Sequence, residues 1–340
     1  MPLPISLIID DGACVNPLYW LQPDQKHNPL IPNEFANAFA DICQQHGVKG
    51  KFSVMPMPSG LGRLDTKLNY VPSHHLQGFL NIVRKKIAPC FDITPELLTH
   101  QAAYDLKTGN FLHIYEDEWV QRATMPEITD YLSLAFRILQ NVGLTATGVT
   151  SPWYTGIHNE NDYAEAIGRA YYRVFHRKFT WYFLHCLGKS PPRRPWISWR
   201  DRRRDLTVVS VPALTSDPFW GTIRAPTQTL ARRSAMQGID DRMITRDGRQ
   251  GRLRELFDRG YPLILLTHWQ CLYSEGRGAG LGGLKELLVR IDRIFGNQVV
   301  WTTLSDLARS AVPAKKYEHQ TASDPVTPIS MISTCVFNKK

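Results

Sequence analysis

Short apolar runs recur along the chain, and polar or turn-forming residues follow each of them. The run Ile5–Ile9 leads into Asp10-Asp11-Gly12, and the run Pro262–Leu266 leads into Thr267-His268. Continuous apolar runs of this length are typical of strands that are buried on both faces. The same pattern predicts strands at residues 50–55, 146–150, 206–211 and 299–302.

Stretches with helical spacing of apolar residues lie between several of these runs. Residues 33–46 are one example, since their apolar positions share one face and the stretch stops at Gly47. Residues 127–141 and 284–295 follow the same rule and also end near a glycine. Thr303-Leu304-Ser305-Asp306 matches a capping box, which predicts a last helix from that point.

Alternating strands and helices favour a parallel sheet with helical crossovers. Six or more such units favour a closed or nearly closed (β/α) barrel, with an open doubly wound sheet as the alternative. No G-x-G-x-x-G fingerprint follows a strand, and we interpret Gly276–Gly283 as a flexible lid or connection. Residues 313–340 show no period, so we predict one domain over residues 1–312 and an extended or disordered tail.

Composition indicates a globular chain, with 43% hydrophobic and 21% charged residues. No apolar run approaches the roughly 20 residues that span a bilayer, and no secretory signal precedes Asp10. We therefore expect a cytoplasmic protein. The six cysteines agree with this, since they form no C-x-x-C pair and suggest neither a disulfide framework nor a cysteine-zinc knuckle.

The formal charge is +9, and arginines are concentrated between Arg193 and Arg204. This cluster is interpreted either as a solvated loop or as a clamp for an anionic substrate or partner. We find no recognised nucleic-acid module, and therefore predict no nucleic-acid partner.

The active face of a parallel barrel lies where its strands end, so residues just beyond apolar runs are the first candidates for chemistry. Asp10 and Asp11 point in different directions as they leave a strand, so one carboxylate can bind a cation while the other accepts a proton. A turn beside Gly12 is the alternative interpretation. His268 follows another strand and can donate a proton, unless it is a core histidine.

Several motifs, in this order, resemble those of the polysaccharide deacetylase (NodB-homology) family. Leu7–Gly12 is similar to the family's first motif, and His100 falls where its His-x-x-x-His metal motif would be. Ser151-Pro152-Trp153-Tyr154 looks like a variant of Arg-x-Pro-Tyr, and Leu265–His268 looks like the closing Leu-x-x-His motif. The resemblance covers about residues 5–310. It implies a distorted (β/α)7-type barrel and a divalent metal, often zinc.

By this resemblance Asp11 and His100 would be metal ligands, Asp10 the general base and His268 the general acid. Two features depart from the family. Tyr104 stands four residues after His100, where we expect the second histidine, and a tyrosine is a poor ligand because its phenol must lose a proton. The arginine of the third motif, which normally orients the base, is absent.

Residues that follow predicted strands also suggest a sugar ligand, since aromatic rings stack on the apolar faces of sugars. The predicted substrate-binding residues are Pro152, Trp153, Tyr154, Asp217, Trp220 and Trp269. The first hypothesis is therefore a metal-assisted hydrolase acting on a small carbohydrate or acylated amine. The second is a non-catalytic carbohydrate-binding relative without the full metal site, and the third is an anion-binding adaptor that uses the arginine cluster.

Overall fold

The computed structural model describes residues 1–17 and 30–313, and the predicted tail lies outside this range apart from Pro313. Eight strands of the described residues pair in parallel with a neighbour. They are β1 (Leu3–Asp10), β2 (Gly50–Val54), β3 (Phe91–Pro95), β6 (Gly148–Thr150), β7 (Phe179–Phe183), β9 (Leu206–Ser210), β10 (Leu263–His268) and β11 (Val299–Trp301). The remaining three pair only in antiparallel fashion, and they are β4 (Ala102–Asp105), β5 (Asn110–Tyr115) and β8 (Trp196–Asp201).

Seven of the described parallel strands close into a distorted ring in the order β1, β2, β3, β6, β7, β9, β10. The join between β3 and β6 is made by isolated bridges, including one between Glu96 and Thr150. The join between β9 and β10 lies just beyond β9, where the N–H of Leu214 donates to the carbonyl of Ile264. The predicted distorted (β/α)7-type barrel is confirmed in this arrangement.

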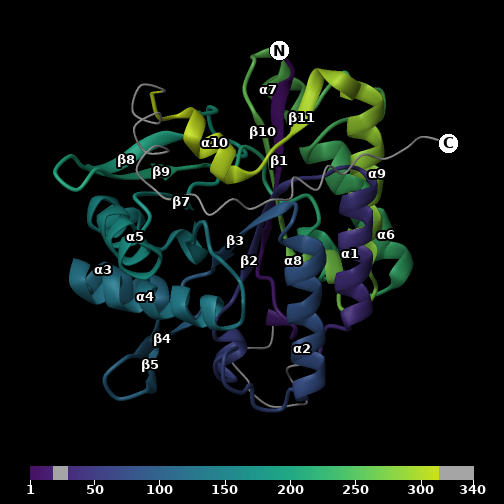
Figure 1. Cartoon of the computed structure of the whole chain (residues 1–340). Coiled ribbons are helices and arrows are strands. Elements are labelled where there is room, and N and C mark those ends of the chain that lie inside the picture. Colours follow the sequence, from purple (N-terminus) through teal and green to yellow (C-terminus); the bar gives the residue numbers. More distant parts are fainter. Residues whose placement is uncertain (18–29, 314–340) are drawn as a thin grey trace.

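Helices surround the strands, with α1, α8 and α9 on one side and α3 to α5 on the other (Figure 1). Their bounds are α1 (Asn33–Gln45), α2 (Ser73–Ile82), α3 (Glu116–Arg122), α4 (Met125–Asn141), α5 (Glu160–Phe175), α6 (Gln228–Arg242), α7 (Arg252–Asp258), α8 (Trp269–Tyr273), α9 (Ala279–Phe295) and α10 (Leu304–Ser310). The predicted helix starts are reproduced where a cap is present. Thr124 and Glu127 form a capping box at α4, and Thr303 accepts from the N–H of Asp306 at α10.

The glycine-rich segment Gly276–Gly283 is not the flexible lid or connection that we predicted, because residues 279–283 form the start of α9. Gly280 lies so close to the backbone carbonyl of Cys271 that an added Cβ would be 2.1 Å from that oxygen. Gly283 similarly faces the ring of Phe219. Glycine at these positions permits close helix packing instead of a loop.

Side chains alternate between the inside of the barrel and the surrounding helices. Ile8, Ile264 and Leu266 belong to an inner apolar cluster, together with residues of β7 and β9. Leu304 and Leu307 of α10 also belong to this cluster. Asp10 and His268 follow on the same alternating positions of β1 and β10, so they face inward at the strand ends.

Candidate functional site

Asp10 and His268 are register partners at the ends of neighbouring parallel strands. Side chains at paired positions of a parallel sheet point to the same face, and adjacent strands lie about 4.8 Å apart. The acid and the imidazole proposed for proton transfer are therefore neighbours at the carboxyl-end rim of the barrel.

Lys51 of β2 provides a cation for Asp10 that sequence reasoning missed. Its side chain is fully buried inside the barrel, and its ammonium forms an ion pair with Oδ1 of Asp10. The same ammonium lies 5.4 Å from the ring centroid of Phe183. A buried lysine is stable only when its charge is compensated, so Lys51 and Asp10 hold one another in place. Lys51 thus fixes the side chain of Asp10 by a buried ion pair.

Asp11, Glu96 and His100 form a cluster of three possible metal ligands at the same rim. One ligand atom from each residue lies within 4.8 Å of the others. Asp11 follows β1 and Glu96 follows β3. His100 lies four residues after Glu96. Asp11 and His100 both have positive φ values, 64° and 72°, which non-glycine residues adopt at an energetic cost and which often mark functional sites.

Glu96 is a candidate ligand that the sequence analysis missed. It stands four residues before His100, so the pair reads Glu-x-x-x-His, whereas we had looked four residues after His100 and found Tyr104. Oε2 of Glu96 accepts from the N–H of Asp11 at 2.7 Å and from the hydroxyl of Ser53 at 2.6 Å. These bonds fix the carboxyl group and leave its other oxygen, Oε1, 3.8 Å from Nε2 of His100.

The orientation of these groups fits a shared cation. Oδ1 of Asp11 lies 2.6 Å from Nε2 of His100, yet this buried oxygen accepts no well-directed hydrogen bond. Its partner oxygen Oδ2 accepts from the side-chain amide of Gln270. Two ligand atoms that lie this close without a well-directed hydrogen bond between them have the arrangement expected of two ligands of one ion. Two carboxylates and one imidazole also make a plausible ligand set for zinc or manganese.

Without a cation, protons on Glu96 and His100 balance the charge of this cluster. Burial raises the pKa of Glu96 to about 8, and the charge of Asp11 acts in the same direction. Burial opposes protonation of His100, but the charges of Asp11 and Glu96 raise its pKa to about 10. For Asp11, burial is outweighed by the charges of His100 and His268, which hold its pKa well below the usual range. A divalent ion would take over the compensating role of these protons.

Trp153 contacts the other side of His100. Its indole N–H donates to Nδ1 of His100 at 3.1 Å, and the two ring centroids are 5.9 Å apart. An indole nitrogen only donates, so this bond requires a lone pair on Nδ1 and places the imidazole proton on Nε2. A metal at Nε2 requires the opposite tautomer. Trp153 therefore favours a form of His100 that must change before Nε2 can bind an ion.

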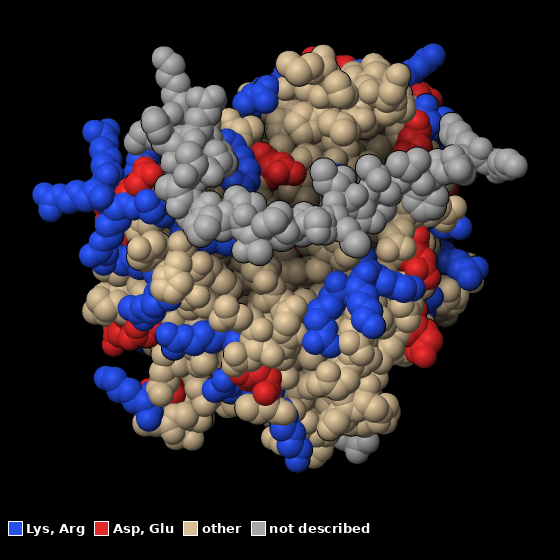
Figure 2. All heavy atoms as spheres, viewed as in Figure 1, with Lys and Arg blue, Asp and Glu red and all other residues tan. Residues whose placement is uncertain are grey.

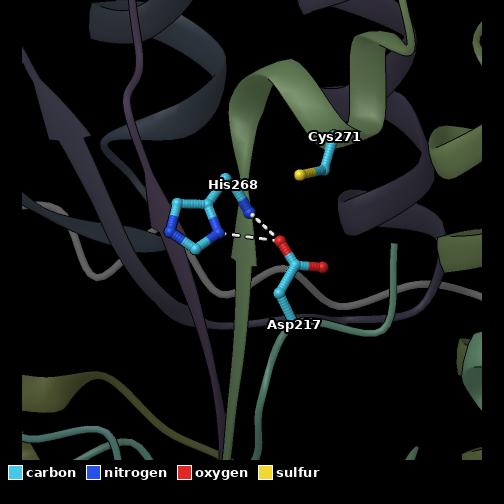
Figure 3. Close-up of side chains that lie close together, drawn as sticks. All are labelled: Asp217, His268 and Cys271. Atoms are coloured by element: carbon cyan, nitrogen blue, oxygen red, sulfur yellow. Dashed lines mark hydrogen bonds and ion pairs between the residues drawn. The ribbon is translucent and has the colours of Figure 1, made fainter. Parts of the chain in front are cut away.

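His268 is held by Asp217 (Figure 3). Oδ2 of Asp217 accepts from Nδ1 of His268 at 2.7 Å and from its backbone N–H at 3.0 Å. This contact places a proton on Nδ1 and leaves Nε2 as the available nitrogen. Burial opposes protonation of His268, but the hydrogen bond that His268 donates to Asp217 and the charges of Asp11, Asp217 and Asp10 raise its pKa to about 9.

Asp217 thus positions His268, and its role in binding substrate stays a prediction. Its second oxygen, Oδ1, accepts from the N–H of Phe219 at 2.7 Å and from the hydroxyl of Thr267 at 3.2 Å. Both oxygens of this buried carboxylate are occupied by the protein. Cys271 lies beside Asp217 and His268 and completes a second group of possible metal ligands (Figure 3). Burial and the charge of Asp217 raise the pKa of its thiol, which makes Cys271 a poor ligand.

Two other predicted site residues lie outside this cluster of rim residues. Tyr104 is in β4, where its ring packs against Phe111 at a centroid distance of 5.3 Å, and it is not in the ligand cluster. Trp269 is fully buried, with its ring 5.2 Å from Phe52, and its indole N–H donates to the carbonyl of Ala13. Trp269 is therefore a core residue and cannot contact a substrate, which corrects that prediction.

The remaining aromatic candidates are exposed beside the site. Trp153 is 63% exposed and Tyr154 51%, and both follow the buried Pro152 with positive φ values. Trp220 is 40% exposed and lies with its ring edge against His268, 5.0 Å between centroids. These three rings are accessible to solvent, while Pro152 is in the turn that carries two of them.

The arginine cluster does not form one clamp. Arg193 stacks on Trp196 at 3.7 Å, whereas Arg194 donates to the carbonyl of Gly260. Arg202 to Arg204 lie in the turn between β8 and β9, where Asp201 accepts from the N–H groups of Arg203 and Arg204. Lys and Arg side chains project from this side of the molecule (Figure 2). Most of the cluster therefore agrees with the solvated-loop interpretation.

Among the described residues, no helix has the length and apolar character needed to cross a membrane. No family model matches the chain, and no curated protein matches it either.

Several solved structures are similar to it. One is a Mycobacterium smegmatis protein assigned to the polysaccharide deacetylases, with 14% identity and a TM-score of 0.48 over 82% of this chain and 76% of that one. Another is a CE4 family pseudoenzyme from Bacillus anthracis, with 12% identity and a TM-score of 0.37 over 91% and 69%. A mutant of that pseudoenzyme with restored enzymatic activity gives 12% and 0.39 over 91% and 72%. Because these identities and TM-scores are low, the function of this chain has to be argued from its own side chains.

Proposed function

We propose that this chain is a metal-assisted hydrolase that cleaves an amide bond of a carbohydrate or related acylated amine, with Asp10 as base and His268 as acid. One observation carries the proposal. A lysine-held acid, a three-ligand cluster and a carboxylate-held imidazole converge on one rim of the barrel. Each of the three is expensive to bury, so their convergence is unusual for a purely structural rim.

Asp11, Glu96 and His100 would hold the metal, and zinc and manganese are the first ions to test. A divalent ion bound there supplies Lewis-acid polarisation of the amide carbonyl and activation of water. Asp10, oriented by Lys51, accepts the proton of the attacking water. His268 carries a proton at neutral pH because of its raised pKa, and Nε2 donates it to the departing amine. Trp153, Tyr154 and Trp220 form the walls against which a sugar ring packs.

A non-catalytic carbohydrate-binding protein is the second candidate. The hydrogen bond from Trp153 to His100 favours it, because that bond holds the imidazole in the tautomer that does not ligate through Nε2. In this case the exposed aromatic rings would still bind a sugar, and protons on Glu96 and His100 would balance the charge of the carboxyl cluster in place of a metal ion.

Acetate release from N-acetylglucosamine oligomers, measured with added zinc or manganese, tests the proposal. We expect metal-dependent release that falls at least about a hundredfold in Asp10→Asn and in His268→Gln, as general acid–base catalysis contributes 10²–10⁴. Tyr104→Phe serves as the control and should keep full activity. Oligomer binding without acetate release from the metal-loaded protein would instead support the second candidate.

A further inference from the structure

A separate cavity of about 340 Å³ lies outside the barrel, between the β4–β5 hairpin and helices α4 and α5. Its polar lining includes guanidinium groups from three different segments, together with Asp130 and Ser133 of α4. Arg63 comes from the loop after β2, Arg137 from α4 and Arg173 from α5. Tyr104 and Leu134 contribute a flat and apolar part of the wall. Tyr104, which does not belong to the metal cluster, thus lines a different site.

The three arginines differ in how their charge is compensated. Arg63 makes a two-pronged contact with Asp65, at 2.9 and 2.8 Å, which fixes the plane of its guanidinium. Arg173 pairs with Asp130 at 2.5 Å. No ion pair or hydrogen bond of the Arg137 side chain is found within residues 1–17 and 30–313. Among the described residues, the cavity therefore contains one guanidinium without an acidic partner and two that are already oriented by one.

Convergent guanidinium groups are the usual protein surface for phosphate and sulfate, because their N–H groups match tetrahedral oxyanions. Three arginines on separate elements can approach different oxygens of one such group, whereas a planar carboxylate is satisfied by one or two. The ring of Tyr104 offers a face for the carbon skeleton that carries the anion. The volume suits a monosaccharide-sized ligand, at the lower end of small-molecule cavities.

We propose that this cavity, which we call the arginine pocket, binds a phosphate or sulfate ester of a small ring compound such as a sugar. Arg137 contacts the anion with a guanidinium that has no acidic partner among the described residues. Arg63 and Arg173 donate hydrogen bonds to the anion from oriented guanidinium groups, and Tyr104 packs on the ring of the ligand. The pocket is distinct from the strand-end site, since its lining includes none of the residues placed there. The proposal does not depend on the hydrolase activity.

Calorimetric titration of the full chain at constant ionic strength tests the arginine pocket. The probes are glucose 6-phosphate, glucose 6-sulfate, inorganic phosphate and sulfate, and glucose as the neutral compound. We expect saturable binding of at least one ester, tighter than binding of its inorganic anion, and no binding of glucose. The relative affinities of the two esters then identify the preferred oxyanion.

The variant Arg137→Gln removes the uncompensated charge, and Arg249→Gln is the matched control. Arg249 is also on the surface, with 86% of its side chain exposed, and lies outside the pocket. Loss of a charged hydrogen bond predicts an affinity at least about tenfold lower for Arg137→Gln and less than about twofold lower for Arg249→Gln. Equal effects of the two variants, or the absence of saturable binding by every ester, would overturn the proposal. Because Arg137 is exposed, both variants should keep the melting temperature of the parent.

Discussion

His100 is subject to opposing demands from its neighbours. Asp11 and Glu96 favour a charged imidazole and raise its pKa to about 10, although burial opposes them. Trp153 can donate to Nδ1 only when the ring is neutral and carries its proton on Nε2. A metal at Nε2 needs a neutral ring with its proton on Nδ1. The Trp153 contact is therefore incompatible with the metal-bound form.

Replacement of Trp153 should reveal this competition. Trp153→Phe keeps an aromatic ring but removes the N–H, so His100 no longer loses a hydrogen bond when it binds an ion. A neutral hydrogen bond contributes about 1 kcal/mol, which predicts zinc affinity about fivefold higher than in the parent. Tyr154→Phe, on the same turn, should leave the affinity unchanged. Zinc affinity that is equal or lower in Trp153→Phe, measured by competition with a chelator, would show that Trp153 does not oppose binding.

The site residues that were predicted from strand ends follow strands with a continuous apolar run, and the residue that was missed does not. Asp10, Asp11 and His268 follow apolar runs, so the strand-end rule located them. Glu96 follows β3, whose sequence Phe91–Pro95 contains Asp92, Thr94 and a proline. These polar side chains face the inside of the barrel, where Thr94 bonds Thr150 and Asp92 bonds Ser305. Because β3 has polar residues on its buried face, it lacks the continuous apolar run from which the other strands were predicted. Neither β3 nor Glu96, which follows it, was therefore predicted.

Element boundaries show the same dependence on local signals. Helices with caps or terminal glycines, such as α1, α4 and α10, were predicted within a few residues. β7 (Phe179–Phe183) and the β4–β5 hairpin were missed, since neither combines a long apolar run with a clear turn. The start of α9 was hidden by glycines, whose low helix propensity is offset here by the close contacts that they allow.

The glycines of α9 provide a matched pair for stability. A Cβ at Gly280 would lie 2.1 Å from the carbonyl oxygen of Cys271, whereas at Gly282 nothing lies within 4 Å. Gly282→Ala should raise the free energy of unfolding by about 0.5–1 kcal/mol through helix propensity. Gly280→Ala should lower it by about 1–3 kcal/mol through overpacking. Urea titrations of both variants measure these changes, and a similar sign for the two would contradict the placement of this turn.

Glu116 connects the start of α3 to the loop that carries His100. Its Oε1 accepts from the N–H groups of Leu98 and Thr99, at 3.1 and 2.8 Å, and from the hydroxyl of Tyr131 at 2.6 Å. Burial raises the pKa of this carboxyl from 4.5 to about 7, despite those three donors. The folded protein therefore binds the proton more tightly than the unfolded chain does.

The consequence is a loss of stability as the pH rises. Between about pH 4.5 and 7 the folded state retains a proton that the unfolded state has released, so the free energy of unfolding falls with pH through this window. Glu116→Gln should remove up to about 3 kcal/mol of that fall. Glu118→Gln, a change at an exposed carboxyl of the same helix, should not. Melting temperatures recorded from pH 5 to 8 would contradict this account if the parent and Glu116→Gln followed the same curve.

At the scale of the whole molecule, the barrel brings together residues that are far apart in sequence. Asp11 and His268 are 257 positions apart in the numbering, yet β1 and β10 are adjacent strands. The closure of the ring was predictable from the count of strand–helix units, because parallel strands need crossovers and a ring of them leaves few free edges. The arginine pocket was not predictable, since its three arginines lie in segments without a shared motif.

Metal binding should therefore stabilise the whole fold, since the proposed ligands tie the end of β1 to the segment after β3. An ion that binds only the folded chain raises its stability by mass action. The size of the shift depends on affinity and on ion concentration, so the metal content and the melting temperature are read on the same samples.

The most direct measurement is the metal content of the purified full chain after reconstitution with zinc or manganese and removal of the excess. The account predicts one ion per chain with a raised melting temperature, both lost in Asp11→Asn, Glu96→Gln and His100→Ala and both kept in Tyr104→Phe. A chain that retains no ion and melts at the same temperature with and without added metal would contradict it, as would a loss of the ion in Tyr104→Phe equal to that in Glu96→Gln.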